Sequence, residues 1–155
     1  MGYYEVDRPL SLSLEEIFEM VLTLDACPCF LHNREDVKVF ADFFKVWGGR
    51  YVEAYQLAKL MEDKAPFEVD LAVVEECEHI LNIYEDNLKK KQYKWIEDNS
   101  IKPLLRNGDM CKYGKIAGVS EYSPASYLIY TEDENRKRVV TFEAAEVDQI
   151  GGKDE

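Results

Sequence analysis

The sequence lacks an apolar run of the roughly 18 residues that a membrane-spanning helix requires. Its first residues carry charges and contain no apolar segment of the kind found in secretory signals. Val6 stands where an N-myristoylation signal has Ser or Thr. The chain has only four cysteines, and without a secretory signal their expected environment is the reducing cytosol. These absences predict a cytoplasmic protein that does not associate with membranes.

Recognisable catalytic motifs are also absent. The sequence contains no Gly-x-Gly-x-x-Gly, Walker, His-Glu-x-x-His or Gly-x-Ser-x-Gly pattern. Paired acids such as Glu15-Glu16 and Glu75-Glu76 are typical of solvated helix faces. We therefore predict that the protein is not an enzyme and that it needs no cofactor.

Positive charge is scarce. The chain carries 19 basic and 31 acidic residues, for a formal charge of −12. Residues 1–100 have 11 basic and 21 acidic groups, net −10, and residues 101–155 have 8 and 10, net −2. Because a phosphate backbone must be met with positive charge, this balance argues against non-specific nucleic-acid binding by the whole surface.

Both histidines and three of the four cysteines lie in two short clusters, which are Cys27, Cys29 and His32 in one and Cys77 and His79 in the other. Zinc prefers such ligands, but the Cys-x-Cys spacing is unusual for it. Two residues two positions apart on a helix point about 200° apart, so Cys77 and His79 cannot share one ion. A redox-sensing thiol, or a nucleophilic cysteine activated by His79, are alternatives. We interpret the first cluster as a structural turn and predict no metal site.

Residues 10–98 have the spacing of a helical bundle. Ser13 and Glu16 form a capping-box pattern that opens a first helix, and Asn33 can cap a second one. Gly48-Gly49 interrupts the second helix, a third follows over 50–62, and Asp70 can cap a long helix that reaches Trp95 or Asp98. The second helix is apolar over much of its circumference, which predicts a central position in the bundle. Its expected core stripe consists of Val37, Phe40, Ala41, Phe44 and Trp47.

After residue 99 the apolar period falls towards two and turn residues become frequent, which is typical of strands. Strands are expected at 110–113, 115–122, 125–131 and 136–142, with a last strand at 146–150 after one helical turn. The run LLRNGDMCKYGKIAGVSEYSPASYLIYTEDENRKRVVTFEAAEVDQI, residues 104–150, resembles a small Src-homology-3-type or KOW-type β-barrel. Such a resemblance implies binding of nucleic acid, peptides or partner subunits, and it does not choose among them.

The predicted fold is therefore α+β. It consists of an acidic helical bundle at 10–98, a five-stranded barrel at 104–150 and a solvated tail at 151–155.

The sequence favours a non-enzymatic protein that binds a partner with a basic surface, as a regulator or inhibitor. Its acidic helices could mimic nucleic acid, as small accessory proteins of phages and mobile elements do. The alternative is a nucleic-acid-binding module that uses the basic hairpin of the barrel, where tyrosines could stack on bases. The candidate binding residues are Glu75 and Glu78 on the helices, and Tyr113, Tyr130, Arg136, Lys137 and Arg138 in the barrel.

Overall fold

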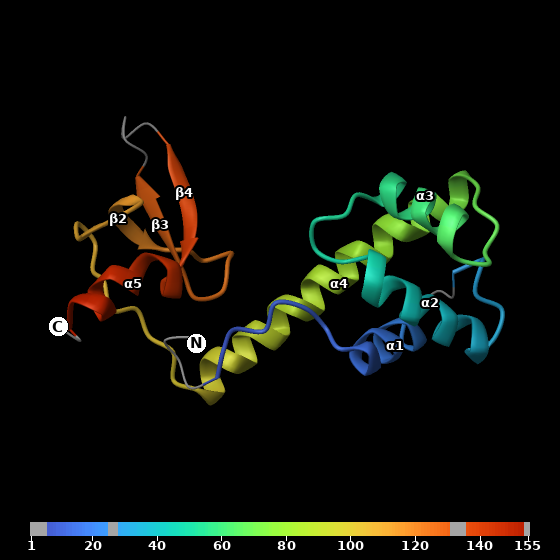
Figure 1. The fold of residues 1–155 in the computed structure, drawn as a ribbon, viewed down its shortest axis with the longest axis horizontal. Helices are drawn as coiled ribbons and strands as arrows, with labels where there is room; N and C mark the ends of the chain where they lie inside the picture. Colours follow the sequence, from blue (N-terminus) through green and yellow to red (C-terminus); the bar gives the residue numbers. More distant parts are fainter. Residues whose placement is uncertain (1–5, 25–27, 131–135, 154–155) are drawn as a thin grey trace. The chain divides into compact units, whose positions relative to one another are not determined.

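The computed structural model describes residues 6–24, 28–130 and 136–153, and it confirms a mixed α+β fold (Figure 1). The chain divides into two compact units, residues Leu10–Leu88 (the helical unit) and residues Met1–Pro9 with Lys89–Glu155 (the sheet unit). Whether 10–98 and 104–150 are separate domains stays a prediction. The elements in chain order are α1 (Leu14–Leu22), α2 (Arg34–Trp47), α3 (Ala54–Lys64), α4 (Leu71–Asp98), β1 (Met110–Cys111), β2 (Gly114–Val119), β3 (Ser126–Tyr130), β4 (Lys137–Thr141) and α5 (Phe142–Lys153).

Three helix starts in the helical unit, those of α1, α2 and α4, follow the predicted caps. At α1 the Glu16 amide donates to Ser13 Oγ at 3.1 Å, and the Ser13 amide donates to Glu16 Oε1 at 2.8 Å. Asn33 caps α2 by accepting from the Asp36 amide at 2.8 Å. Asp70 accepts from the Val73 amide at 3.0 Å at the start of α4. Side chains that bind otherwise unpaired amides of the first turn account for these boundaries.

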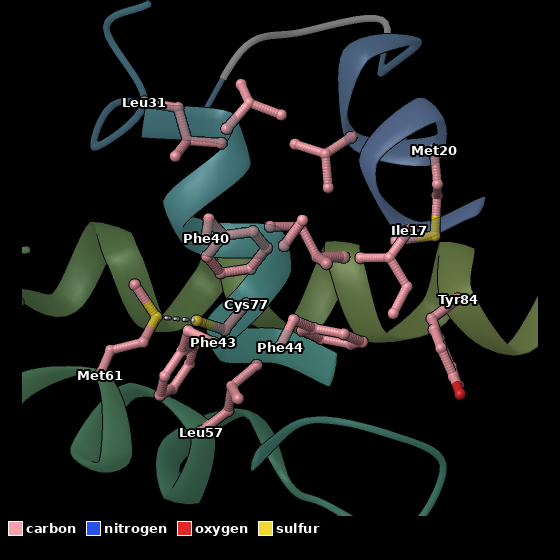
Figure 2. Close-up of a cluster of buried hydrophobic side chains, with 14 of the residues drawn as sticks. Ile17, Met20, Leu31, Phe40, Phe43, Phe44, Leu57, Met61, Cys77 and Tyr84 are labelled. Atoms are coloured by element: carbon pink, nitrogen blue, oxygen red, sulfur yellow. Dashed lines mark hydrogen bonds between the residues drawn. The ribbon is translucent and has the colours of Figure 1, made fainter. Parts of the chain in front are cut away.

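Helix α2 lies at the centre of the helical unit, and its aromatic side chains fill the core (Figure 2). Phe40 and Phe44 are fully buried, with ring centroids 5.7 Å apart, and Phe44 lies 5.2 Å from the Tyr84 ring. Cys77 of α4 is also fully buried and donates to Met61 Sδ at 3.6 Å. Tilted ring pairs at these separations add to the stabilisation that apolar burial provides.

The prediction that Trp47 belongs to that core is wrong. Its side chain is 40% exposed, and Lys64 Nζ lies 5.6 Å from its ring centroid. Trp47 is the last residue of α2, so the core beneath the preceding turn does not extend to it. The chain leaves the helix at Gly48, where a Cβ would come within 2.6 Å of the Phe44 ring. Glycine is needed there because Phe44 occupies the space.

The sheet unit contains an antiparallel sheet in the order β1-β2-β3-β4, with α5 packed on its core face (Figure 1). Lys112 and Tyr113 form the tight turn between β1 and β2. Gly114, at φ +136°, completes this turn, and a Cβ on it would clash with the carbonyl oxygen of Tyr130. Glycine therefore lets β2 approach the end of β3. The buried core consists of Trp95, Ile101, Leu105, Ile116, Ala125, Tyr127, Ile129, Val140, Phe142 and Ala145.

The predicted closed five-stranded barrel is wrong, because the sheet is open and has four strands in the described chain. The expected closing strand at 146–150 is part of helix α5. Thr141 Oγ1 accepts from the Ala144 amide at 3.3 Å, as a side chain does at a helix start. Phe142, Ala145 and Glu146 are buried together. Their spacing has the helical period, whereas the sequence-based prediction divided these residues among the end of a strand, a short turn and the closing strand.

The segment before α1 is held to the sheet unit by Arg8. Its Nε and Nη2 donate to the two carboxylate oxygens of Glu143 at 2.8 and 3.0 Å, and Nη1 donates to the Pro124 carbonyl at 2.7 Å. Nη2 also donates to the Ala125 carbonyl at 2.6 Å, and the guanidinium lies 5.1 Å from the Trp95 ring centroid. The planar donor fork of arginine matches these partners in a way that lysine cannot. Residues far apart in sequence thus share one core.

In the part of the chain that the structure describes, no helix combines the length and the apolar character that crossing a bilayer requires.

Candidate functional site

The cysteine–histidine clusters do not form one site. Cys77 points into the helical core and His79 is exposed, while Cys29 and His32 line a separate hollow of about 460 Å³ together with Asp36. Cys27 lies outside the described residues. Among those that are described, no three of the His, Cys, Asp and Glu side chains are placed to hold a metal ion.

Cys29 has the opposite of the environment that activates a thiol. Its backbone amide donates to Glu76 Oε2 at 2.7 Å. A side-chain hydrogen bond to Glu76, then slight desolvation and the neighbouring negative charges, raise the pKa of the exposed Cys29 thiol to about 11. Burial raises the pKa of Cys77 to about 12. Since the thiolate is the nucleophile, both thiols are poorly suited to covalent chemistry at neutral pH.

Alkylation of Cys29 by iodoacetamide should therefore be slow at pH 7 and should increase until the pH passes about 11, despite the exposure of the residue. Glu76→Gln removes the carboxylate and should shift this profile to lower pH. Peptide mapping by mass spectrometry separates Cys29 from the other cysteines. A midpoint below 8.5 in the unmodified protein would contradict this environment.

A groove of about 660 Å³ lies between the loop before α3 and the exposed side of α4. Its apolar lining comes from Val52, Val74 and Leu81, which also pack on the helical core. Tyr51 and Tyr55 line its edge and are 90% and 64% exposed. Two strongly exposed aromatic side chains beside an apolar floor are typical of a binding surface.

The charge on this groove is negative. Glu53, Glu78 and Glu85 line it, and Arg50 lies 3.1 Å from Glu85 and neutralises it. No ion pair with another described residue neutralises Glu53 or Glu78. Of the two predicted helical site residues, the structure thus places Glu78 in the groove and leaves Glu75 exposed outside it.

The charge of the whole helical unit has the same sign. Residues 10–88 contain 17 acidic and 6 basic residues, net −11, and the rest of the chain contains 14 and 13, net −1. A segment of basic character would therefore be attracted to this unit before it reached the groove.

A second surface lies on the face of the sheet opposite α5. Tyr130 of β3 pairs with Lys115 of β2 on one side and with Lys137 of β4 on the other. Directly paired residues point to the same face, so the three side chains form one row across the strands. Tyr130 is half-buried, both lysines are exposed, and Lys137 Nζ lies 5.5 Å from the Tyr130 ring centroid.

The remaining predicted residues of the sheet unit do not join this row. Arg138 pairs with the core residue Ile129, so it points to the α5 side, and its guanidinium lies 5.2 Å from the Tyr113 ring. Lys112 Nζ lies 5.1 Å from the same ring. Arg136 is exposed before the start of β4. The predicted tyrosine–cation surface therefore separates into the row through Tyr130 and a pair of cations around Tyr113.

Sequence reasoning missed Tyr51 and Tyr55 as surface residues because both fitted the spacing of a third helix over 50–62. Helix α3 begins only at Ala54, so Tyr51 belongs to the loop that follows Gly49. The signal that could have indicated this was the Gly48-Gly49 pair, which is typical of a chain that leaves its helix and turns.

No family model matches this chain, and no curated protein and no solved structure is significantly similar to it. The resemblance of residues 104–150 to Src-homology-3-type and KOW-type barrels therefore stays a prediction.

Proposed function

We propose that this protein is a non-enzymatic binding protein whose helical unit takes up a basic, partly apolar segment of a protein partner. The groove between residues 49–55 and α4 carries the proposal, because it combines an apolar floor, two exposed tyrosines and unneutralised carboxylates. Occupation of a basic surface on the partner would block other anionic ligands of that surface. A regulator or inhibitor acts in this way.

The residues of the groove would contribute to binding in different ways. Tyr51 and Tyr55 bury large apolar areas at a small cost in side-chain entropy when a partner covers them. Glu53 and Glu78 select for Lys or Arg on the incoming segment. The net charge of −11 on the unit accelerates the encounter, and its effect falls as salt is added, with a Debye length of about 8 Å at physiological ionic strength.

Peptides selected from a random library displayed on phage provide the probe, with the full chain as bait. We expect the selected peptides to combine Lys or Arg with aromatic or branched apolar residues. Fluorescence anisotropy of one synthetic peptide should then show a loss of affinity of about tenfold or more in Tyr51→Ala, since exposed aromatic anchors dominate such interfaces. Glu78→Lys should weaken binding about fivefold, mainly through the association rate.

Two matched controls separate the groove from general effects. Glu75→Lys makes the same charge change on the same helix outside the groove, and it should have a clearly smaller effect than Glu78→Lys. Tyr122→Ala removes a similarly exposed tyrosine (81%) from the sheet unit and should leave the affinity unchanged. Equal losses in the two glutamate variants, or selected peptides without basic residues, would show that the groove is not the binding site.

A further inference from the structure

We infer that the open face of the sheet carries a second binding site, distinct from the groove, for single-stranded nucleic acid. The row Lys115–Tyr130–Lys137 places one aromatic residue between two lysines of the flanking strands, and Lys137 Nζ lies 5.5 Å from the ring centroid. Neighbouring strands lie about 4.8 Å apart, so the two lysine backbones are separated by roughly 10 Å with the ring between them. This arrangement offers a surface on which a base can stack while flanking phosphates meet the lysines.

The surroundings of the row leave room for a strand. Gly118, Leu128 and Val139 follow on the same face, and Val139 is 49% exposed. A Cβ built on Gly118 would meet only Asn107, at 3.8 Å, so this part of the face is flat and open. The core-side residues Ile129 and Val140 are buried against α5, which keeps the sheet rigid beneath the open face.

The cations of this surface form no ion pair with the carboxylates that the structure describes. Among the described residues, no carboxylate lies within ion-pair distance of Lys115, Arg136 or Lys137. The sheet unit as a whole is nearly neutral, at net −1, in contrast to the helical unit at −11. In sequence the acids 132–134 precede Arg136, so the local charge is balanced and the expected affinity is modest. Non-specific binding of this kind has dissociation constants of about 10⁻⁴–10⁻⁶ M.

Base stacking and phosphate contact favour a single strand over a duplex or a protein as the ligand of this face. In a duplex the base faces are already stacked, so a half-buried ring such as Tyr130 gains little from it. A protein partner would need a larger apolar surface than Leu128 and Val139 supply. Every base has a stackable face, so little dependence on sequence is expected.

The test uses the full-length protein and fluorescein-labelled 12-nucleotide oligo(dT) and oligo(U), with fluorescence anisotropy between 50 and 200 mM salt. Tyr130→Ala should weaken binding about tenfold, and Tyr130→Phe, which keeps the ring, should bind as the unchanged protein does. Lys115→Gln with Lys137→Gln should reduce the slope of log K against log salt by about 1.4, which corresponds to two phosphate contacts on a single strand.

Lys59→Gln with Lys64→Gln makes the same charge change on α3 and should leave the slope unchanged. Circular dichroism melting curves establish that each variant is folded. The inference is overturned if the unchanged protein shows no binding below 1 mM oligonucleotide at 50 mM salt, or if Tyr130→Phe loses as much affinity as Tyr130→Ala. It is also overturned if the two lysine pairs have equal effects. Each of these outcomes leaves the groove proposal untouched.

Discussion

Replacing Phe44 with alanine should lower the free energy of unfolding by about 3–5 kcal/mol, the range for a large side chain removed from a packed core. Phe44 is 1% exposed, its ring contacts the rings of Phe40 and Tyr84, and it fills the space against Gly48 (Figure 2). The backbone of α2 cannot collapse into the vacated volume, because α2 packs against both α1 and α3. Urea unfolding followed by far-ultraviolet circular dichroism measures the change.

Trp47→Ala is the natural control for this variant. It removes a larger side chain from the same helix, but one that is 40% exposed, so the loss should be clearly smaller. A loss below about 1 kcal/mol for Phe44→Ala would mean that the residue does not lie in a packed core.

Replacing Arg8 with alanine should lower the free energy of unfolding by about 3 kcal/mol or more, although Arg8 lies near the start of the chain. The side chain is 8% exposed and neutralises Glu143, so its removal leaves a partly buried carboxylate without its partner. The carbonyls of Pro124 and Ala125 lose one donor each and keep Ser126 Oγ and the Phe142 amide. Because Glu143 keeps 29% exposure, water offsets part of the cost, which places the expected loss at the lower end for broken buried pairs.

Urea unfolding of Arg8→Ala, Arg8→Lys and Arg8→Ala with Glu143→Ala tests this arrangement. Lysine retains the charge without the fork, so it should recover only part of the stability. The double variant should be more stable than the sum of the single losses predicts, because each single change removes the same interaction. Additive losses would contradict the pair observed between Arg8 and Glu143.

The sequence was sufficient for features that depend on local chemistry. The caps at Ser13, Asn33 and Asp70 and the first four of the five expected strands were predictable, because they follow from side-chain hydrogen bonding and short-range periodicity. The α5 helix was missed because a short apolar run fits either period, and only the packing of Phe142 and Ala145 on the sheet core decides between them.

The candidate sites were less predictable than the elements that carry them. The role of Arg8 depends on Glu143, which lies 135 positions away, and no local pattern indicates such a contact. Glu75 and Glu78 look alike in sequence. Only the position of the loop that carries Tyr51 determines that Glu78 lines the groove and Glu75 does not. The register that aligns Lys115, Tyr130 and Lys137 is likewise a property of the paired strands rather than of any single one.

Chemical-shift mapping of the ¹⁵N-labelled full chain, titrated with the selected basic peptide, tests the central claim most directly. If the helical unit binds the peptide in the groove, the largest amide shifts should fall within residues 49–55 and on the α4 residues 74–85 that line it. Shifts concentrated instead in β2, β3 and β4, or spread over all acidic surfaces without a maximum at the groove, would contradict it.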